Sequence, residues 1–266
     1  MAARAMWKGR IQFGNIEVPV KLYAGLNDQK VHFRLLHAKD LVPVVQKMVH
    51  PRTGEVVDSP DTRQGYEIEP GRYVILDPEE LEALEPEPSR RIHLTAFVAP
   101  TEIGHAYYDR PYFLGPDSSL QAYATMAAAL EKCGLAAIAR WTMRKKSYVG
   151  ALHAGDGLLQ LVTLRSRELV VEAEQLPRPA YRELEDQERR MAEQLVKALE
   201  RPFEPAAYTD DYRDRVRDLI AAKARGAPVE RKPTPKPKPR VVSLAEALKK
   251  SVKQAQEERR KERKVG

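Results

Sequence analysis

The sequence has little cysteine and no long apolar run. Cys133 is its only cysteine, which excludes a disulfide framework and a cysteine-rich zinc motif. A lone thiol suits a reducing interior, and we expect Cys133 to be a buried, small hydrophobic side chain. Apolar stretches fall short of the about 18–20 residues that a membrane span requires, and the charged residues 1–10 do not resemble a signal peptide. These absences favour a cytoplasmic protein without membrane contact.

Motifs for catalysis and metal binding are also missing. The sequence contains no Gly-rich loop that ends in Lys-Ser or Lys-Thr and no nucleophile elbow. Its six histidines are scattered, without a pair at metal-ligand spacing on a helix. The acidic clusters Glu79-Glu80-Glu82 and Asp210-Asp211 are typical of helix starts, although carboxylates can also hold Mg²⁺. We therefore expect no catalytic residue, no metal site and no cofactor.

Charge is unevenly distributed along the chain. The net charge is +7, and residues 225–266 carry fourteen Lys and Arg against five Asp and Glu, an excess of +9. The remaining residues sum to −2, with positive excesses of +6 in residues 1–54 and +4 in residues 136–170 and an acidic stretch between them. Such segregation predicts local positive surfaces for a polyanion and a phosphate-binding tail.

Alternating apolar and polar residues predict a largely antiparallel β structure. Residues 7–24 alternate around a Gly14-Asn15 turn and indicate a hairpin. A second hairpin is expected to run from residues 42–50 through the turn at 51–54 to residues 55–57. Further strands are expected at residues 73–76, 92–98, 106–114, 136–143, 148–152 and 158–164. The pattern is typical of a barrel or a sandwich.

Helices are expected at four places. Asp77 and Pro78 predict a short helix that ends near Leu84, and Ser118 or Ser119 caps a helix over residues 120–133. Leu120, Ala124, Ala127 and Leu130 share one face of that helix, which we expect to cover the sheet. Two later helices carry apolar stripes that need a surface, either their own barrel or a partner subunit. The stripes contain Tyr181, Leu184, Met191, Leu195, Tyr212, Val216 and Leu219.

Several segments resemble bacterial Ku proteins. The start of the chain, RAMWKGRIQFGNIEVPVKLY at residues 4–23, resembles the first hairpin of that family. Further matches follow in order as HFRLLH at 32–37, GRYVIL at 71–76, DPEELEAL at 77–84, YYDRPY at 107–112, AIARW at 137–141 and YTDDYR at 208–213. The resemblance spans essentially the whole body of the chain, from about residue 4 to residue 225.

The resemblance implies a mixed, mainly β fold. An antiparallel β-barrel core over residues 1–175 would carry an arch at about residues 31–66, and two such chains would form a ring that encircles DNA. A helical arm for dimerisation or partner contact would follow at residues 176–226. Residues 227–266 would form a Pro/Lys-rich linker and a flexible basic tail.

Basic residues in four places are candidates for contact with DNA phosphates. The resemblance assigns Arg34, Lys39, Lys47, Arg52 and Arg63 to the arch, and Arg140, Arg144, Lys145 and Lys146 to the barrel. The basic first segment adds Lys8, Arg10 and Lys21, and the composition of the tail adds Lys249, Lys250 and Lys253. Some family members carry cysteines near the tip of the arch, where this chain has His50-Pro-Arg-Thr, so we expect no zinc there.

By resemblance, the chain is a non-enzymatic, nucleoid-associated homodimer that binds double-stranded DNA ends without sequence preference. It would protect and bridge the ends and recruit an ATP-dependent DNA ligase, ligase D, through residues 205 onward, in non-homologous end joining. One alternative is a metal-dependent nuclease or accessory DNA-processing subunit, which would show Mg²⁺-dependent turnover. Another is a protein-interaction scaffold with an incidental basic tail, whose DNA binding would disappear with residues 227–266.

Overall fold

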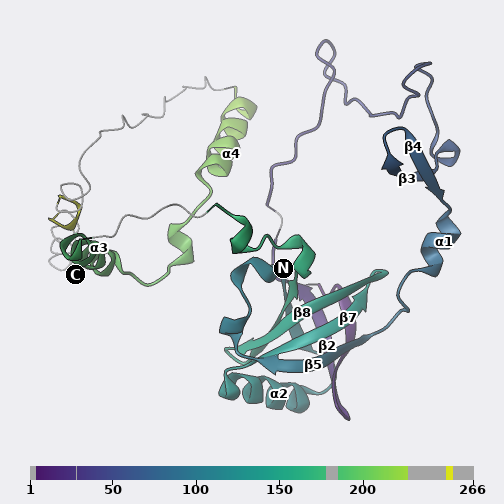
Figure 1. Cartoon of the computed structure of the whole chain (residues 1–266). Coiled ribbons are helices and arrows are strands. Elements are labelled where there is room, and N and C mark those ends of the chain that lie inside the picture. The colour runs from purple at the N-terminus through teal and green to yellow at the C-terminus, as the bar shows by residue number, and fades with distance from the viewer. Residues whose placement is uncertain (1–3, 28, 178–184, 227–249, 254–266) are drawn as a thin grey trace. The chain divides into compact units, whose positions relative to one another are not determined.

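The computed structural model describes residues 4–27, 29–177, 185–226 and 250–253. The chain divides into two compact units, Met1–Gln175 and Leu176–Gly266 (Figure 1). Three residues predicted from the sequence lie outside the described residues: Tyr181 and Leu184 of the helical arm, and Lys249 of the tail. The boundaries of the arch, the arm and the tail stay predictions.

The first unit contains a closed barrel in the order β1-β2-β6-β9-β8-β7-β5 (Figure 1). Its strands are β1 (Trp7–Phe13), β2 (Ile16–Ala24), β5 (Arg91–Val98), β6 (Tyr108–Pro116), β7 (Ala136–Met143), β8 (Lys146–Gly155) and β9 (Leu158–Leu164). Neighbouring strands of the barrel pair antiparallel, except that β1 and β5 pair parallel and close it. The predicted, mainly antiparallel β-barrel is confirmed.

The two-residue period of the strands separates an apolar interior from a charged outer wall. Ile11, Val20 and Leu22 are fully buried in the barrel core, whereas Lys8 and Arg10 alternate with inward residues on β1 and are exposed. Because successive side chains of a strand point to opposite faces, burial of one set directs the other outward. The core of the barrel therefore determines where its cations lie.

Helix α2 (Leu120–Cys133) begins and ends as the sequence predicts, but it is rotated about its axis. Ser119 caps it by accepting a hydrogen bond from the amide of Ala122, and Gly134 ends it at a φ of 63°. Its buried residues are Tyr123, Ala127 and Leu130. The predicted face is wrong in its first turns, since Leu120 and Ala124 are exposed, and Cys133 is exposed instead of buried.

Tyr123 accounts for this rotation. Its hydroxyl donates to the carbonyl of Leu114 at 2.5 Å and accepts from the amide of Leu159 at 2.9 Å, joining α2 to β6 and β9. The tyrosine is 3% exposed. Two hydrogen bonds to buried backbone groups hold Tyr123 toward the barrel and turn Leu120 into solvent.

The chain leaves the barrel between β2 and β5. This excursion, residues 25–90, contains a hairpin of β3 (Gln64–Glu69) and β4 (Arg72–Leu76), then α1 (Pro78–Ala83). The predicted hairpin over residues 42–57 is reduced to its tip, where Val49 and Val56 form an isolated antiparallel bridge, and a second isolated bridge joins Leu36 with Pro43.

Two helices of the second unit match the predicted helical period. They are α3 (Asp186–Leu199) and α4 (Asp211–Ala224). Met191 and Leu195 on α3 and Val216 on α4 are half-buried, whereas Tyr212 and Leu219 are exposed. In the described part of the chain, neither helix has a fully buried residue. Their apolar stripes remain largely uncovered.

Replacing Tyr123 with Phe should destabilise the barrel. The substitution keeps the ring but leaves the Leu159 amide and the Leu114 carbonyl without their partner, and each buried unsatisfied group costs about 1–3 kcal/mol. We expect a lower urea midpoint with an unchanged slope. The control is Tyr212→Phe, at a side chain that is 71% exposed. Equal midpoints for the two variants would contradict the role given to Tyr123.

Candidate nucleic-acid interface

The candidate basic residues occupy four parts of the structure. Lys8, Arg10 and Lys21 lie on β1 and β2 of the barrel wall; Arg34, Lys39, Lys47, Arg52 and Arg63 on the excursion; Arg140 on β7 and Arg144, Lys145 and Lys146 at the turn into β8; and Lys250 and Lys253 in a short helical stretch of the second unit. These groups differ in how far acidic side chains already neutralise them.

On the excursion the cations are exposed and mostly unneutralised. Arg34, Lys39, Lys47 and Arg52 have no acidic partner among the described residues, and Arg63 donates only to the carbonyls of Pro60 and Thr62 at 2.9 Å each. An unneutralised, solvated guanidinium or ammonium group is free to contact phosphate.

The nearby acid Asp40 is already engaged. It contacts His37 at 2.7 Å and accepts from the amide of Val42, and these hydrogen bonds, the one with His37 first, lower the pKa of its carboxyl group. Asp40 thus closes the local turn rather than pairing with Lys39.

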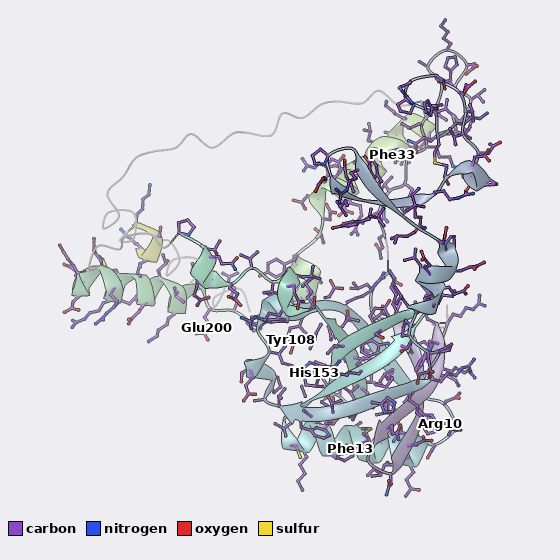
Figure 2. All side chains as sticks on the ribbon, turned by 45° about the vertical axis from the view of Figure 1, so that its right-hand side comes forward. Arg10, Phe13, Phe33, Tyr108, His153 and Glu200 are labelled. Carbon is purple, nitrogen blue, oxygen red and sulfur yellow. The ribbon has the colours of Figure 1, made fainter. Side chains whose placement is uncertain are left out.

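The same excursion exposes large apolar side chains. Phe33 is 71% exposed, Val45 80% and Tyr66 67%, and Figure 2 shows Phe33 on this part of the chain. Further exposed apolar residues are Leu35, Leu36, Leu41, Val42, Val44, Met48, Val49, Val56, Ile68, Tyr73, Val74 and Ile75. Apolar exposure on this scale is typical of a surface that another molecule covers.

The turn between β7 and β8 places its cations under backbone strain. Arg144 and Lys145 have φ values of 51° and 63°, between the paired residues Met143 and Lys146. Two central residues in the left-handed backbone conformation match the twist of a hairpin. Glycine and asparagine adopt this conformation more easily than residues with long side chains do. Strain of this kind is concentrated at functional sites. Arg144 and Lys146 have no partner in the described part of the chain.

Lys145 of this turn is held by acidic residues. Its ammonium lies 2.9 Å from Glu85 and 3.2 Å from Glu82, and these hydrogen bonds raise the pKa of Lys145. Glu82 and Glu85 lie in and just after α1, where the excursion returns to the barrel. A phosphate that approaches Lys145 must compete with both carboxylates.

The barrel-wall cations are also paired. Lys21 lies 2.8 Å and Lys8 3.5 Å from Asp117, and Arg10 lies 2.7 Å from Glu17. The hydrogen bond to Asp117 raises the pKa of Lys21. Figure 2 shows Arg10 at the outer wall of the barrel. These cations are fixed in position and only partly neutralised.

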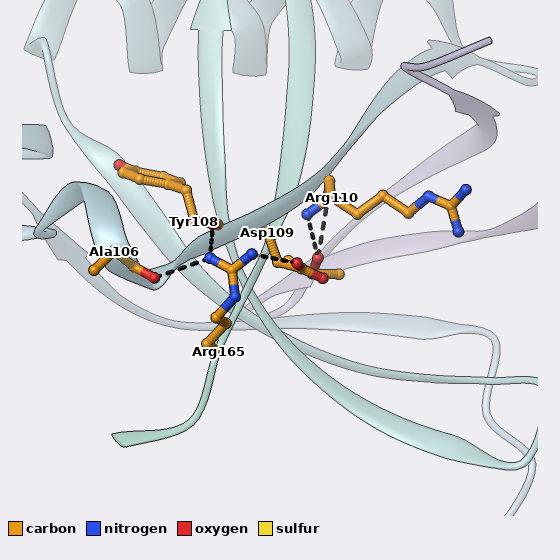
Figure 3. Close-up of polar contacts among 6 residues, drawn as sticks. Ala106, Tyr108, Asp109, Arg110 and Arg165 are labelled. Carbon is orange, nitrogen blue, oxygen red and sulfur yellow. Dashed lines mark hydrogen bonds and ion pairs between the residues drawn. The ribbon is translucent and has the colours of Figure 1, made fainter. Parts of the chain in front are cut away.

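Sequence reasoning missed Arg110, whose position depends on a β-bulge. The pairing of β6 with β9 shifts register between Tyr108 and Pro111, and the hydroxyl of Thr163 binds both the amide and the carbonyl of Arg110 at 2.8 and 3.2 Å. Arg165 secures the same strand through the carbonyls of Ala106 and Tyr108 and the carboxylate of Asp109 (Figure 3). The side chain of Arg110 extends away from these contacts.

Arg90 and Arg91 were missed as well. They stand at the start of β5, beside β1, and line the same part of the barrel wall as Lys8 and Arg10. Two neighbouring arginines at the start of a predicted strand could have indicated this site. The alternation of apolar and polar residues does not predict which distant strand pairs with them.

The acidic clusters serve the local structure. Asp77 and Glu80 form a capping box at the start of α1, and Asp210 caps α4 by accepting from the amide of Arg213 at 3.0 Å. Among the described residues, no group of three or more His, Cys, Asp or Glu side chains could hold a metal ion. The helices in the described ranges are too short or too polar to cross a membrane.

The chain thus belongs to a class of proteins in which a closed seven-stranded barrel carries an exposed basic excursion. Comparison with known proteins identifies its family. Residues 12–194 match the family described as the Ku70/Ku80 beta-barrel domain. Non-homologous end joining protein Ku 2 of Geotalea uraniireducens (strain Rf4) is 35% identical over 85% of this chain and 88% of its own length. The Ku proteins of Anaeromyxobacter sp. (strain K) and Heliobacterium modesticaldum (strain ATCC 51547 / Ice1) are 36% and 35% identical, over 92% and 98% of this chain and 84% and 96% of their own lengths. The chain belongs to the Ku family.

Releasing Lys145 should strengthen binding to duplex DNA. We expect the double variant Glu82→Gln, Glu85→Gln to bind about two- to fivefold more tightly at low salt, because exposed ion pairs of this strength no longer compete with phosphate. Fluorescence anisotropy with a labelled duplex measures the difference, which should shrink at high salt.

The matched control for this experiment is Glu79→Gln, Glu102→Gln. It makes the same charge change at exposed residues that have no partner among the described ones. If both double variants gain affinity equally, the contacts of Lys145 do not restrain DNA binding.

Proposed function

We propose that this protein binds the ends of double-stranded DNA, without sequence preference, as a ring-shaped homodimer. The main support is the excursion of residues 25–90, which leaves the closed barrel after β2 and returns at β5. This segment carries both unneutralised cations and a large exposed apolar surface. The related proteins are named for non-homologous end joining. We assign the same process to this chain.

The chemistry of the cations supports binding without sequence preference. Arg34 and Lys47 lie on irregular backbone, whereas Arg52 and Arg144 lie on turns. Direct base readout in the major groove commonly uses a helix or a two-stranded ribbon that fits the groove, whereas phosphate contacts carry no sequence information. Binding should therefore depend on salt and on access to an end.

The apolar side chains of the excursion support a homodimer. Leaving Phe33, Val45 and Tyr66 exposed in water is unfavourable, and burial gains about 25 cal/mol for each Å² of apolar surface. A second copy of the excursion offers the same apolar character with two-fold symmetry. Two excursions joined in this way close a ring whose inner face carries the cations, and DNA enters it at an end.

The second unit supports a role in recruitment. Val196 and Leu199 on α3 and Tyr212 on α4 are exposed apolar residues that the described chain leaves uncovered. We assign residues 205 onward to contact with an ATP-dependent DNA ligase, ligase D, and the helical arm to partner contact. Lys250 and Lys253 of the tail, with Lys249, would add non-specific contacts to phosphates of the DNA beyond the ring. The protein would then act on the nucleoid by protecting and bridging ends while the ligase performs the chemistry.

End binding is tested by comparing a linear duplex with the same duplex closed into a circle. With the full chain, at equal salt and without nucleotide or metal, we expect clear preference for the linear form, because a closed ring of protein has no entry to closed DNA. Equal affinity for both forms would mean ordinary adhesion to the backbone.

Removing residues 227–266 separates this function from that of a scaffold with a basic tail. The shortened chain should still prefer linear DNA, with lower affinity and a weaker salt dependence, because residues 227–266 carry a net charge of +8 and the rest of the chain −1. Complete loss of DNA binding in the shortened chain would favour the scaffold.

Charge placed on the apolar surface should dissociate the dimer. We expect Phe33→Asp, Val45→Asp to sediment as a monomer at concentrations where the wild type is dimeric, because two carboxylates would be buried without partners. The control Gln29→Asp, Gln46→Asp adds the same charge at exposed polar residues of the same segment and should stay dimeric. A dimeric Phe33→Asp, Val45→Asp variant would place the dimer interface elsewhere.

A further inference from the structure

A hollow in the barrel wall brings together cations from separate parts of the sequence. It measures about 540 Å³ and is lined by Lys8, Arg10, Arg90, Arg91, Asp117 and Ser118, among others. Lys8 and Arg10 come from β1, Arg90 and Arg91 from the entry into β5, and Asp117 and Ser118 from the residues that directly follow β6. We call this feature the barrel-wall hollow.

The parallel pairing of β1 with β5 builds the hollow. The amide of Arg10 donates to the carbonyl of Arg90 at 2.8 Å, and Arg10 stands opposite Arg91 in the register. Gly9 permits this approach, because a Cβ atom there would lie 2.5 Å from the Arg90 carbonyl oxygen and 1.9 Å from the ring of Trp7. The strand pairing thus sets the two arginine-bearing segments side by side.

Two carboxylates hold four of the cations in pairs. Asp117 lies between Lys8 at 3.5 Å and Lys21 at 2.8 Å. Glu17 lies between Arg10 at 2.7 Å and Arg91 at 3.5 Å. The hydrogen bond from Lys21 lowers the pKa of Asp117, so this carboxyl group stays ionised. Each carboxylate therefore holds two cationic side chains close to one another.

The hollow keeps a positive excess at its mouth. The side chain of Arg90 has no partner within the described residues, and four cations that line the hollow, Lys8, Arg10, Arg90 and Arg91, stand against one lining carboxylate, Asp117. With the adjoining Lys21 and Glu17 the balance is five cations to two carboxylates. The side chains of Asp117 and Glu17 are 29% and 31% exposed, whereas those of Lys8, Arg10 and Arg91 are 57–60% exposed. The acids lie deeper than most of the cations, and an arriving anion meets positive charge first.

We propose that the barrel-wall hollow binds a backbone phosphate of the DNA, with Arg90 as the main contact and Asp117 and Glu17 as positioning residues. The proposal rests on the proposed function and adds a second DNA contact region to the excursion. A guanidinium group presents a planar fork of donors that fits the two non-bridging oxygens of a backbone phosphate, and the remaining lone pairs of these oxygens stay available to Arg10 or Arg91.

The positioning role predicts an effect opposite to that of simple charge. Asp117→Asn makes the protein more positive, so a diffuse attraction would tighten DNA binding. If Asp117 instead holds Lys8 and Lys21 at the hollow, its loss lets them disperse and weakens binding. We expect weaker binding, and tighter binding would overturn the role of Asp117.

The main test measures end binding of the full chain over a series of salt concentrations. For Arg90→Ala we expect affinity for a blunt linear duplex to fall about five- to tenfold, as for the loss of one charge-assisted contact. The slope of log affinity against log salt should lose about one unit, equally for two duplexes of unrelated sequence. Arg90→Lys keeps the charge without the fork and should lie between the wild type and Arg90→Ala.

The matched control is Lys132→Ala, an exposed cation at the last turn of α2. Identical affinity and salt slope for Arg90→Ala and Lys132→Ala would overturn the inference, provided that thermal melting shows both variants folded. If the wild type itself fails to prefer linear over circular DNA, the proposed function fails instead. Calorimetry measures the binding of inorganic phosphate to the same variants. If Arg90→Ala loses phosphate binding but keeps its affinity for DNA, the hollow is a site for free anions, and its assignment to DNA is overturned.

Discussion

The parallel pairing of β1 with β5 closes the barrel, and it does so across a chain excursion of residues 25–90. Closure satisfies the strand edges within one chain, so the barrel offers no free edge for pairing with another protein. The excursion leaves the barrel at the end of β2 and returns at the start of β5. It is thus tied at both ends to a rigid body although it has almost no core of its own.

This constraint separates two kinds of basic residue. Cations on the barrel wall, such as Lys21 and Arg10, are held by half-buried carboxylates, so their positions are defined and their charge is partly neutralised. Cations on the excursion, such as Lys47 and Arg52, have no such partners in the described part of the chain. A polyanion is attracted most strongly by the second kind and is placed most accurately by the first. The two kinds of cation together suit a surface that first attracts a polyanion and then places it.

Local patterns in the sequence predicted the elements better than the surfaces that they form. The hairpin at residues 7–24 and the bounds of α2 follow from alternation, turn residues and caps, which act over a few residues. The face of α2 was predicted incorrectly because Tyr123 bonds backbone groups of two distant strands. Arg90 and Arg110 were missed for the same reason: a parallel strand pairing places one and a β-bulge the other. Pairing of Lys145 with Glu82 and Glu85 likewise depends on the path by which the excursion returns.

Topological trapping can establish whether two copies of this chain form a ring around DNA. Protein is loaded onto a linear duplex, the ends are sealed into a circle, and the salt is then raised until protein leaves the open form. The ring predicts that protein stays on the sealed circle at that salt and is released when the circle is cut. Equal loss from sealed and open DNA would contradict a ring and leave only surface adhesion.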